Sequence, residues 1–63
     1  MYRKVFTTKQ LAEYLSLSEA LLNNLRAYGI GPVYMKIGRL VRYRIEDVDK
    51  WLAEQAEKNN SFH

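Results

Sequence analysis

The sequence predicts a small α+β domain in which two short helices precede a β-hairpin and a third helix follows it. Two segments repeat apolar residues at helical spacing, and a short serine-containing link separates them. A glycine-rich segment and two short β-type runs come next, before a third helical pattern. With 63 residues the chain has room for one domain, predicted to span 1–63 with an ordered core of about residues 5–57.

The first helix is predicted to begin near Thr8 and to end near Ser16. Thr7 stands three residues before Gln10, the spacing of a capping box, in which each side chain accepts a hydrogen bond from a free backbone N–H. Its apolar stripe consists of Leu11, Ala12 and Leu15.

The second helix is predicted to begin after Ser18 and to run to about Tyr28. Ser18 is a natural N-cap, Glu19 complements the dipole of the first turn, and Gly29 ends the helix. The predicted buried face consists of Leu21, Leu22, Leu25 and Tyr28. The opposite stripe is small and polar and consists of Ala20, Asn23, Asn24 and Ala27.

Residues 33–37 and 40–44 are predicted to form a hairpin around Gly38-Arg39. A two-residue loop with glycine first suits a type II′ turn, whereas a loop longer by two residues would change the register. The shorter loop places Tyr34 opposite Tyr43 and Met35 opposite Arg42. The residues expected to pack inward are Tyr34, Val41 and Tyr43, and Arg42 and Arg44 are expected to face water or a ligand.

The third helix is predicted to begin at Glu46, because Glu46 and Asp47 suit a first helical turn. Its core face consists of Val48, Trp51 and Leu52, and its outer face is acidic. Residues 59–63 are expected to form a frayed tail.

This order of elements is that of a winged helix-turn-helix, whose second helix fits a DNA major groove while the hairpin follows the neighbouring backbone or minor groove. Basic and acidic residues are concentrated in different parts of the chain, in agreement with this architecture. Residues 1–44 hold eight Lys/Arg against two acidic residues, and residues 45–63 hold five acidic residues against two lysines. Such blocks can be solvated faces, but here they favour a surface that binds double-stranded DNA.

Candidate DNA contacts fall into three groups. The second helix offers Ser18, Glu19, Ala20, Asn23, Asn24, Arg26 and Ala27. The hairpin offers Lys36, Gly38, Arg39, Arg42 and Arg44. Near the N-terminus, Arg3, Lys4 and Thr8 are expected to contact the DNA backbone. Asparagine can pair with adenine, alanine permits close approach, and cations neutralise phosphates, with roughly four to six phosphate contacts expected.

Some of these residues have a second interpretation. Glu19 could accept a hydrogen bond from cytosine or only complement the helix dipole, and Arg26 could contact a phosphate or favour the helix end by its charge. Exposed asparagines can serve solubility alone. Four tyrosines are either core residues or surfaces on which unpaired bases could stack. They are Tyr14, Tyr28, Tyr34 and Tyr43.

Catalysis and cofactor binding are not expected. The chain has no cysteine, its one histidine is the terminal His63, and no nucleophile–base pair or metal-ligand spacing is present. We therefore expect no enzyme activity, no metal, no cofactor and no small-molecule substrate. No apolar segment is long enough for a membrane span or signal peptide, so the expected compartment is the cytoplasm.

Four stretches together resemble the excisionase-type helix-turn-helix family, which is related to MerR-like winged-helix domains and AlpA-type phage regulators. They are TTKQLAEYLSLS at 7–18, GIGP at 29–32, KIGRLVRY at 36–43, and EDV with WL at 46–52. The resemblance covers nearly all of residues 5–52. It implies that residues 18–27 form the recognition helix and that Gly38 and Arg39 form the tip of the wing, with Lys36 and Arg42 nearby.

The resemblance implies a DNA-binding protein of a phage or mobile element. Such recombination directionality factors bind repeated sites, often cooperatively through self-association, bend DNA and direct a site-specific integrase toward excision. Two alternatives remain open: a transcriptional regulator with a promoter target, and a protein-interaction module whose acidic third helix docks a basic partner such as an integrase. This chain has Glu19, Ala20 and Leu21 where the family often has an early basic or aromatic residue.

Overall fold

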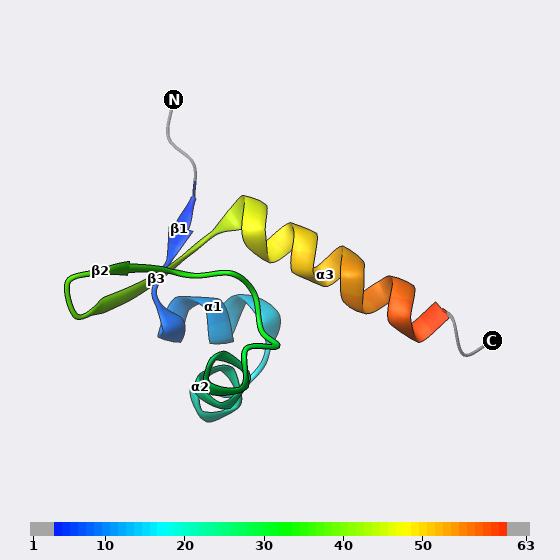
Figure 1. The fold of residues 1–63 in the computed structure, drawn as a ribbon, viewed down its shortest axis with the longest axis horizontal. Helices are drawn as coiled ribbons and strands as arrows, with labels where there is room; N and C mark the ends of the chain where they lie inside the picture. The colour runs from blue at the N-terminus through cyan, green and yellow to red at the C-terminus, as the bar shows by residue number, and fades with distance from the viewer. Residues whose placement is uncertain (1–3, 61–63) are drawn as a thin grey trace.

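A computed structural model describes residues 4–60 and confirms the small α+β, winged helix-turn-helix architecture (Figure 1). Two helices lie below a small sheet, and a third helix extends from the sheet to one side. The elements in chain order are β1 (Val5–Phe6), α1 (Thr8–Leu15), α2 (Glu19–Tyr28), β2 (Met35–Ile37), β3 (Leu40–Arg44) and α3 (Ile45–Asn60).

The sheet has three antiparallel strands in the order β1-β3-β2, where the sequence had predicted only the hairpin. The additional strand β1 pairs Val5 with Arg44 and Phe6 with Tyr43. The backbone N–H of Ile45 also donates to the carbonyl of Lys4 at 2.9 Å. A two-residue strand is too short to show alternation in the sequence, so only the fold reveals that the N-terminal segment is part of the sheet.

The predicted hairpin register is confirmed, with Met35 opposite Arg42 and a two-residue turn at Gly38-Arg39. Gly38 has a φ of 62°, whereas Arg39 does not have a positive φ, as a type II′ turn requires. The first strand is shorter than predicted, so Tyr34 lies outside the ladder. Its ring is still 6.3 Å from that of Tyr43, but Tyr34 is 40% exposed and does not pack fully inward.

The predicted helix starts are confirmed by their caps. The Thr7 hydroxyl accepts from the Gln10 N–H, and the Gln10 side chain accepts from the Thr7 N–H, both at 3.0 Å. The Ser18 hydroxyl caps α2 by accepting from the Leu21 N–H at 3.0 Å. Gly29, with a φ of 71°, ends α2 as expected.

The core is formed by Phe6, Leu11, Ala12, Leu22, Tyr43 and Val48. Two predicted core residues of α2 are wrong, because Leu21 and Tyr28 are 41% and 79% exposed. A molecule this small covers only the narrow stripe of α2 around Leu22 and Leu25, so residues at the margins of the predicted face stay in water. Leu52 of α3 is likewise at the margin and is 37% exposed.

Helix α3 is longer than predicted, because it continues through Asn59 and Asn60. Residues 61–63 of the predicted tail lie outside the described residues. Val48 is fully buried in the core, and the Trp51 indole N–H donates to the carbonyl of Ile30 at 2.9 Å. Beyond this anchor α3 extends away from the sheet (Figure 1) and lengthens the molecule to 42 Å.

Candidate nucleic-acid interface

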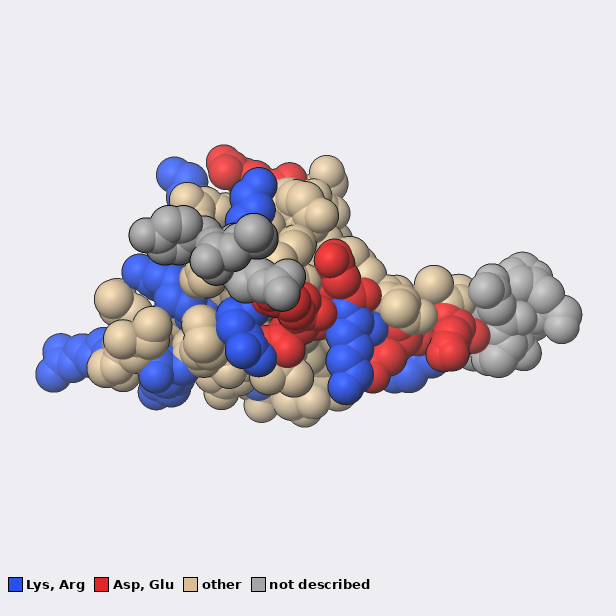
Figure 2. All heavy atoms as spheres, turned by 90° about the horizontal axis from the view of Figure 1, so that it is seen from above, with Lys and Arg blue, Asp and Glu red and all other residues tan. Residues whose placement is uncertain are grey.

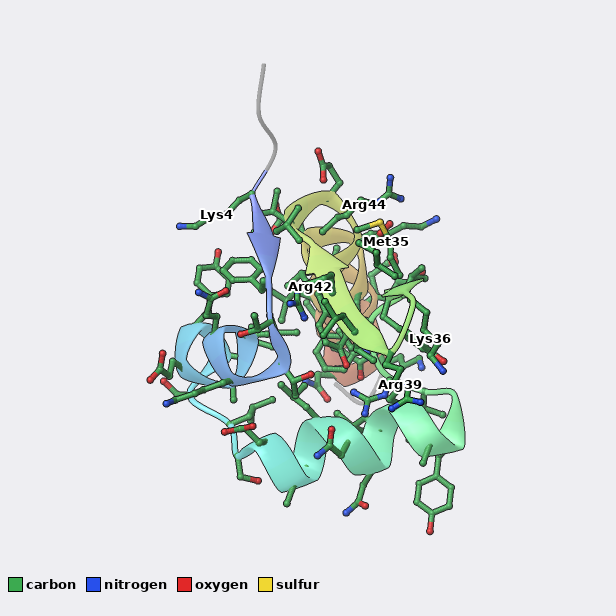
Figure 3. All side chains as sticks on the ribbon, turned by 90° about the vertical axis from the view of Figure 1, so that its left-hand side faces the viewer. Lys4, Met35, Lys36, Arg39, Arg42 and Arg44 are labelled. Carbon is green, nitrogen blue, oxygen red and sulfur yellow. The ribbon has the colours of Figure 1, made fainter. Side chains whose placement is uncertain are left out.

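Helix α2 presents its small, polar stripe to solvent, as the sequence predicted. Ala20, Asn23, Asn24 and Ala27 are all exposed, as is Glu19 in the first turn. Figure 3 shows the side chains on this side of α2 pointing away from the rest of the molecule. Ser18 is exposed as well, and its hydroxyl caps the helix.

Arg26 lies at the centre of a side-chain network that sequence analysis did not predict. Its Nη1 donates to the Tyr43 hydroxyl at 3.1 Å, and its Nη2 donates to Oδ1 of Asn23 at 2.9 Å. Its guanidinium also lies 5.8 Å from the centre of the Tyr34 ring, within cation–π range. Arg26 is half-buried, and its guanidinium is engaged by these three side chains.

The two asparagines differ in what they can offer to DNA. The side-chain carbonyl oxygen of Asn23 accepts from Arg26, whereas the side chain of Asn24 has no hydrogen-bond partner among residues 4–60. Asn24 thus keeps both its donor and its acceptor for a base edge, which is what adenine recognition needs.

The hairpin of β2 and β3, here called the wing, carries two exposed cations near its turn. Arg39 occupies the turn beside Gly38, and Lys36 is in β2. Neither has an ion-pair partner within the described part of the chain. The wing extends beyond α1 and α2 (Figure 1), and Figure 3 places Lys36 and Arg39 at the end of the sheet nearer to α2.

The other two wing arginines are on the outer side of β3 and are engaged within the protein. Arg42 donates from Nη1 to the carbonyl of Val41 at 2.7 Å and is half-buried. Arg44 forms a salt bridge from Nε to Oδ2 of Asp47 at 2.9 Å. The hydrogen bond and charge of Asp47 hold the pKa of Arg44 above its ordinary value, so the guanidinium stays charged at every working pH.

The N-terminal candidates lie farther from α2. Lys4 is exposed, with Nζ 5.6 Å from the centre of the Phe6 ring, and Figure 3 shows Lys4 and Arg44 at the end of the sheet away from α2. Thr8 is half-buried in the first turn of α1. Arg3 lies outside the described residues. The cations are thus divided between a pair near α2 and others along the sheet.

Five of the seven acidic residues lie on α3, and the other two are Glu13 on α1 and Glu19 on α2. Figure 2 shows basic side chains gathered at the wing end and acidic side chains along α3, with further basic side chains among the acidic ones. A polyanion approaching the wing therefore meets positive charge, whereas most of the acidic side chains lie along α3.

A family model described as a helix-turn-helix domain matches residues 5–56, from β1 to well into α3. The chain belongs to this helix-turn-helix family. No curated protein matches the chain. In this helix-turn-helix domain, α1 and α2 form the two helices of the motif, and membership of the family supports sequence-specific DNA binding.

Other site types are not found in the described part of this helix-turn-helix domain. Residues 4–60 contain no group of three or more histidine, cysteine or carboxylate side chains able to hold a metal ion. The helices within that range are too short and too polar to cross a bilayer. The contacts of Tyr34 and Tyr43 with Arg26 were not predicted, because they join residues far apart in the chain.

Proposed function

We propose that this protein is an excisionase-type DNA-binding protein, which bends duplex DNA and directs a site-specific integrase toward excision. The observation that supports the proposal is the placement of the exposed α2 stripe next to the wing end that carries Lys36 and Arg39. The sequence resemblance over residues 5–52 favours excision over other roles of the same fold.

In this proposal, residues of α2 contact base edges and residues of the wing contact phosphates. Asn24 pairs with adenine through N6 and N7, and Ala20 and Ala27 allow α2 to lie close to the groove floor or against a thymine methyl. Lys36 and Arg39 neutralise phosphates beside that groove. Because the wing and α2 are rigidly joined through the core, binding both at once favours a bent duplex.

This role needs no chemistry from the protein itself. Bending a site of 20–30 base pairs costs about 1–6 kcal/mol, which additional phosphate contacts can offset. The protein acts by shaping DNA for the integrase, so we propose no enzyme activity and no cofactor for it. Repeated sites bound side by side, with contacts between protein copies, would increase the bend.

Excision in vitro tests this proposal. A supercoiled plasmid carrying the attachment sites of the element is incubated with its integrase, with and without the protein. We expect excision to increase with the protein, and Arg39→Ala and Asn24→Ala to reduce the increase. Footprinting should show protection of short repeats beside the integrase sites. Protection confined to a promoter, with no effect on excision, would instead indicate a transcriptional regulator.

A second candidate function is docking of a basic partner, such as the integrase, on α3. It is favoured by the extension of α3 away from the sheet and by three exposed carboxylates. Asp49, Glu54 and Glu57 have no ion-pair partner among residues 4–60. Changing these three to lysine should leave DNA affinity undiminished and abolish partner binding, whereas Arg39→Ala should do the reverse.

A further inference from the structure

We propose that Asn23 contacts DNA through its amide N–H donors, because its carbonyl oxygen is already turned to Arg26, and that position 23 therefore selects guanine. This inference rests on the proposed insertion of α2 into the major groove. It assigns Arg26 a positioning role, in which it sets the base preference through Asn23 without touching the DNA.

The chemistry of arginine fixes the orientation of the Asn23 amide. A guanidinium carries only N–H donors, so the atom of Asn23 that lies 2.9 Å from Nη2 of Arg26 must be the oxygen. The amide nitrogen is then turned away from Arg26. Asn23 is exposed, so its two N–H groups are available to a ligand in front of α2.

Arg26 cannot easily release Asn23, because two other elements hold its guanidinium. The Tyr43 hydroxyl accepts from Nη1 at 3.1 Å, and the Tyr43 ring is 1% exposed and fixed in the core. The centre of the Tyr34 ring lies 5.8 Å from the guanidinium, within cation–π range. A guanidinium held at three points is preorganised, so little conformational entropy is lost when DNA binds.

A donor-only side chain distinguishes the four bases in the major groove. Guanine presents two acceptors, N7 and O6, which the two N–H groups of Asn23 can bind together. Adenine and thymine each present one acceptor beside groups that the amide cannot use, and cytosine presents only a donor. The expected preference at this position is therefore guanine first and cytosine last.

Asn24 provides the comparison within the same helix. It has the same side chain and is also exposed, but it has no hydrogen-bond partner among the described residues. Its amide can rotate to present both donor and acceptor, and it is expected to select adenine. Two adjacent asparagines thus have different preferences because one is bound by Arg26.

Selection of binding sites from a random duplex library tests the inference. Asn23→Ala identifies the base position at which preference is lost, and Asn24→Ala identifies its neighbour's position. We expect guanine at the first position, preferred over cytosine by about 5- to 150-fold. Asn23→Asp should move that preference to cytosine, because one carboxylate oxygen accepts from Arg26 and the other accepts from cytosine N4. Asn24→Asp, the matched control, should leave the position assigned to Asn23 unchanged.

Two further variants test Arg26 itself. Arg26→Met frees the Asn23 oxygen and should move the preference from guanine toward adenine. Tyr43→Phe keeps the core ring but removes one anchor of Arg26, and it should weaken the guanine preference without replacing it. Circular dichroism melting of each variant verifies that it is folded. If the Arg26→Met variant is unfolded, the base preference of the Asn23→Asp variant tests the inference instead.

The outcomes separate this inference from the proposed function. If the wild-type protein selects a specific sequence but adenine or cytosine occupies the position assigned to Asn23, the inference is wrong and the DNA-binding function stands. The same holds if Asn23→Ala changes no position. If no sequence is enriched at all, the proposed function fails and the inference fails with it.

Discussion

The turn between α1 and α2 depends on Ser16, whose backbone has a φ of 58°. Its N–H donates to the carbonyls at the end of α1, and the Leu17 N–H donates to the Ala12 carbonyl at 2.8 Å. These bonds fix the direction in which α2 leaves α1. A left-handed backbone costs about 1–2 kcal/mol for an ordinary residue, so this turn carries a local strain.

Substitution of Ser16 measures that strain. Ser16→Gly should leave the free energy of unfolding unchanged or raise it slightly, because glycine adopts positive φ freely but is more flexible when unfolded. Ser16→Val should lower it by about 1–2 kcal/mol, because a β-branched side chain opposes this backbone. Urea unfolding of both variants checks the prediction, and an equal loss in the two would contradict it.

The capping box at the start of α1 gives a second test at the residue scale. Thr7→Ala removes the acceptor of the Gln10 N–H and frees the Gln10 side chain, so stability should fall by about 1 kcal/mol. Thr8→Ala is the matched control, because Thr8 follows the cap and its side chain makes no hydrogen bond to another described residue. Thermal unfolding of the pair should differ; a similar change in both would exclude a capping role.

Residue-scale features were predicted well where their causes are local in sequence. The caps at Thr7, Ser18 and Gly29 each depend on neighbours within three or four residues, so their spacing suffices. The environment of Arg26 depends on Tyr43, 17 residues away, and no periodicity reports such a contact. For the same reason, the sequence could not show that Asn23 and Asn24 differ.

At the scale of elements, α2 and the wing have separable roles. In the proposed mode of binding, the α2 stripe contacts bases and determines sequence preference, whereas the wing contacts phosphates and contributes affinity for any sequence. The sequence predicted both elements and the hairpin register, because glycine at the turn and alternation in β3 fix them. It missed β1, and it placed Leu21 and Tyr28 in the core although α2 buries a narrower face.

Asn24→Ala tests the role assigned to α2. Loss of an asparagine–adenine pair should weaken binding to the selected site by about 1–3 kcal/mol, while binding to unrelated duplexes stays nearly constant. Fluorescence anisotropy with both duplexes at one salt concentration checks this. Glu13→Ala on α1 serves as a control outside the proposed interface. An equal loss on both duplexes would show that Asn24 does not recognise a base.

At the scale of the whole molecule, the distribution of charge determines the dependence of binding on salt. Arg44 is paired with Asp47, and Arg26 is hydrogen-bonded to Tyr43 and Asn23, so fewer cations are available than the eight Lys/Arg of residues 1–44 suggest. Counting the remaining cations of the wing and sheet leaves about three to four phosphate contacts. The logarithm of affinity should then fall with the logarithm of salt at a slope of about −3.

Arg39→Ala should reduce the magnitude of that slope by about 0.9, because one phosphate contact is lost from the wing tip. Lys50→Ala, on α3, should leave the slope unchanged. Titrations between 50 mM and 200 mM salt give both values. A flat dependence for the wild-type protein would contradict the proposed mode of binding.

The hydrogen bond from Trp51 to Ile30 gives the molecule a built-in optical probe. Trp51 is the sole tryptophan of the chain, and its indole joins α3 to the loop that follows α2. The fluorescence emission of Trp51 therefore reports on the contact between α3 and the proposed DNA-binding elements. A change in the emission wavelength when duplex is added would show that the contact between Trp51 and Ile30 rearranges. A constant emission wavelength would show that α3 keeps its position relative to the loop after α2.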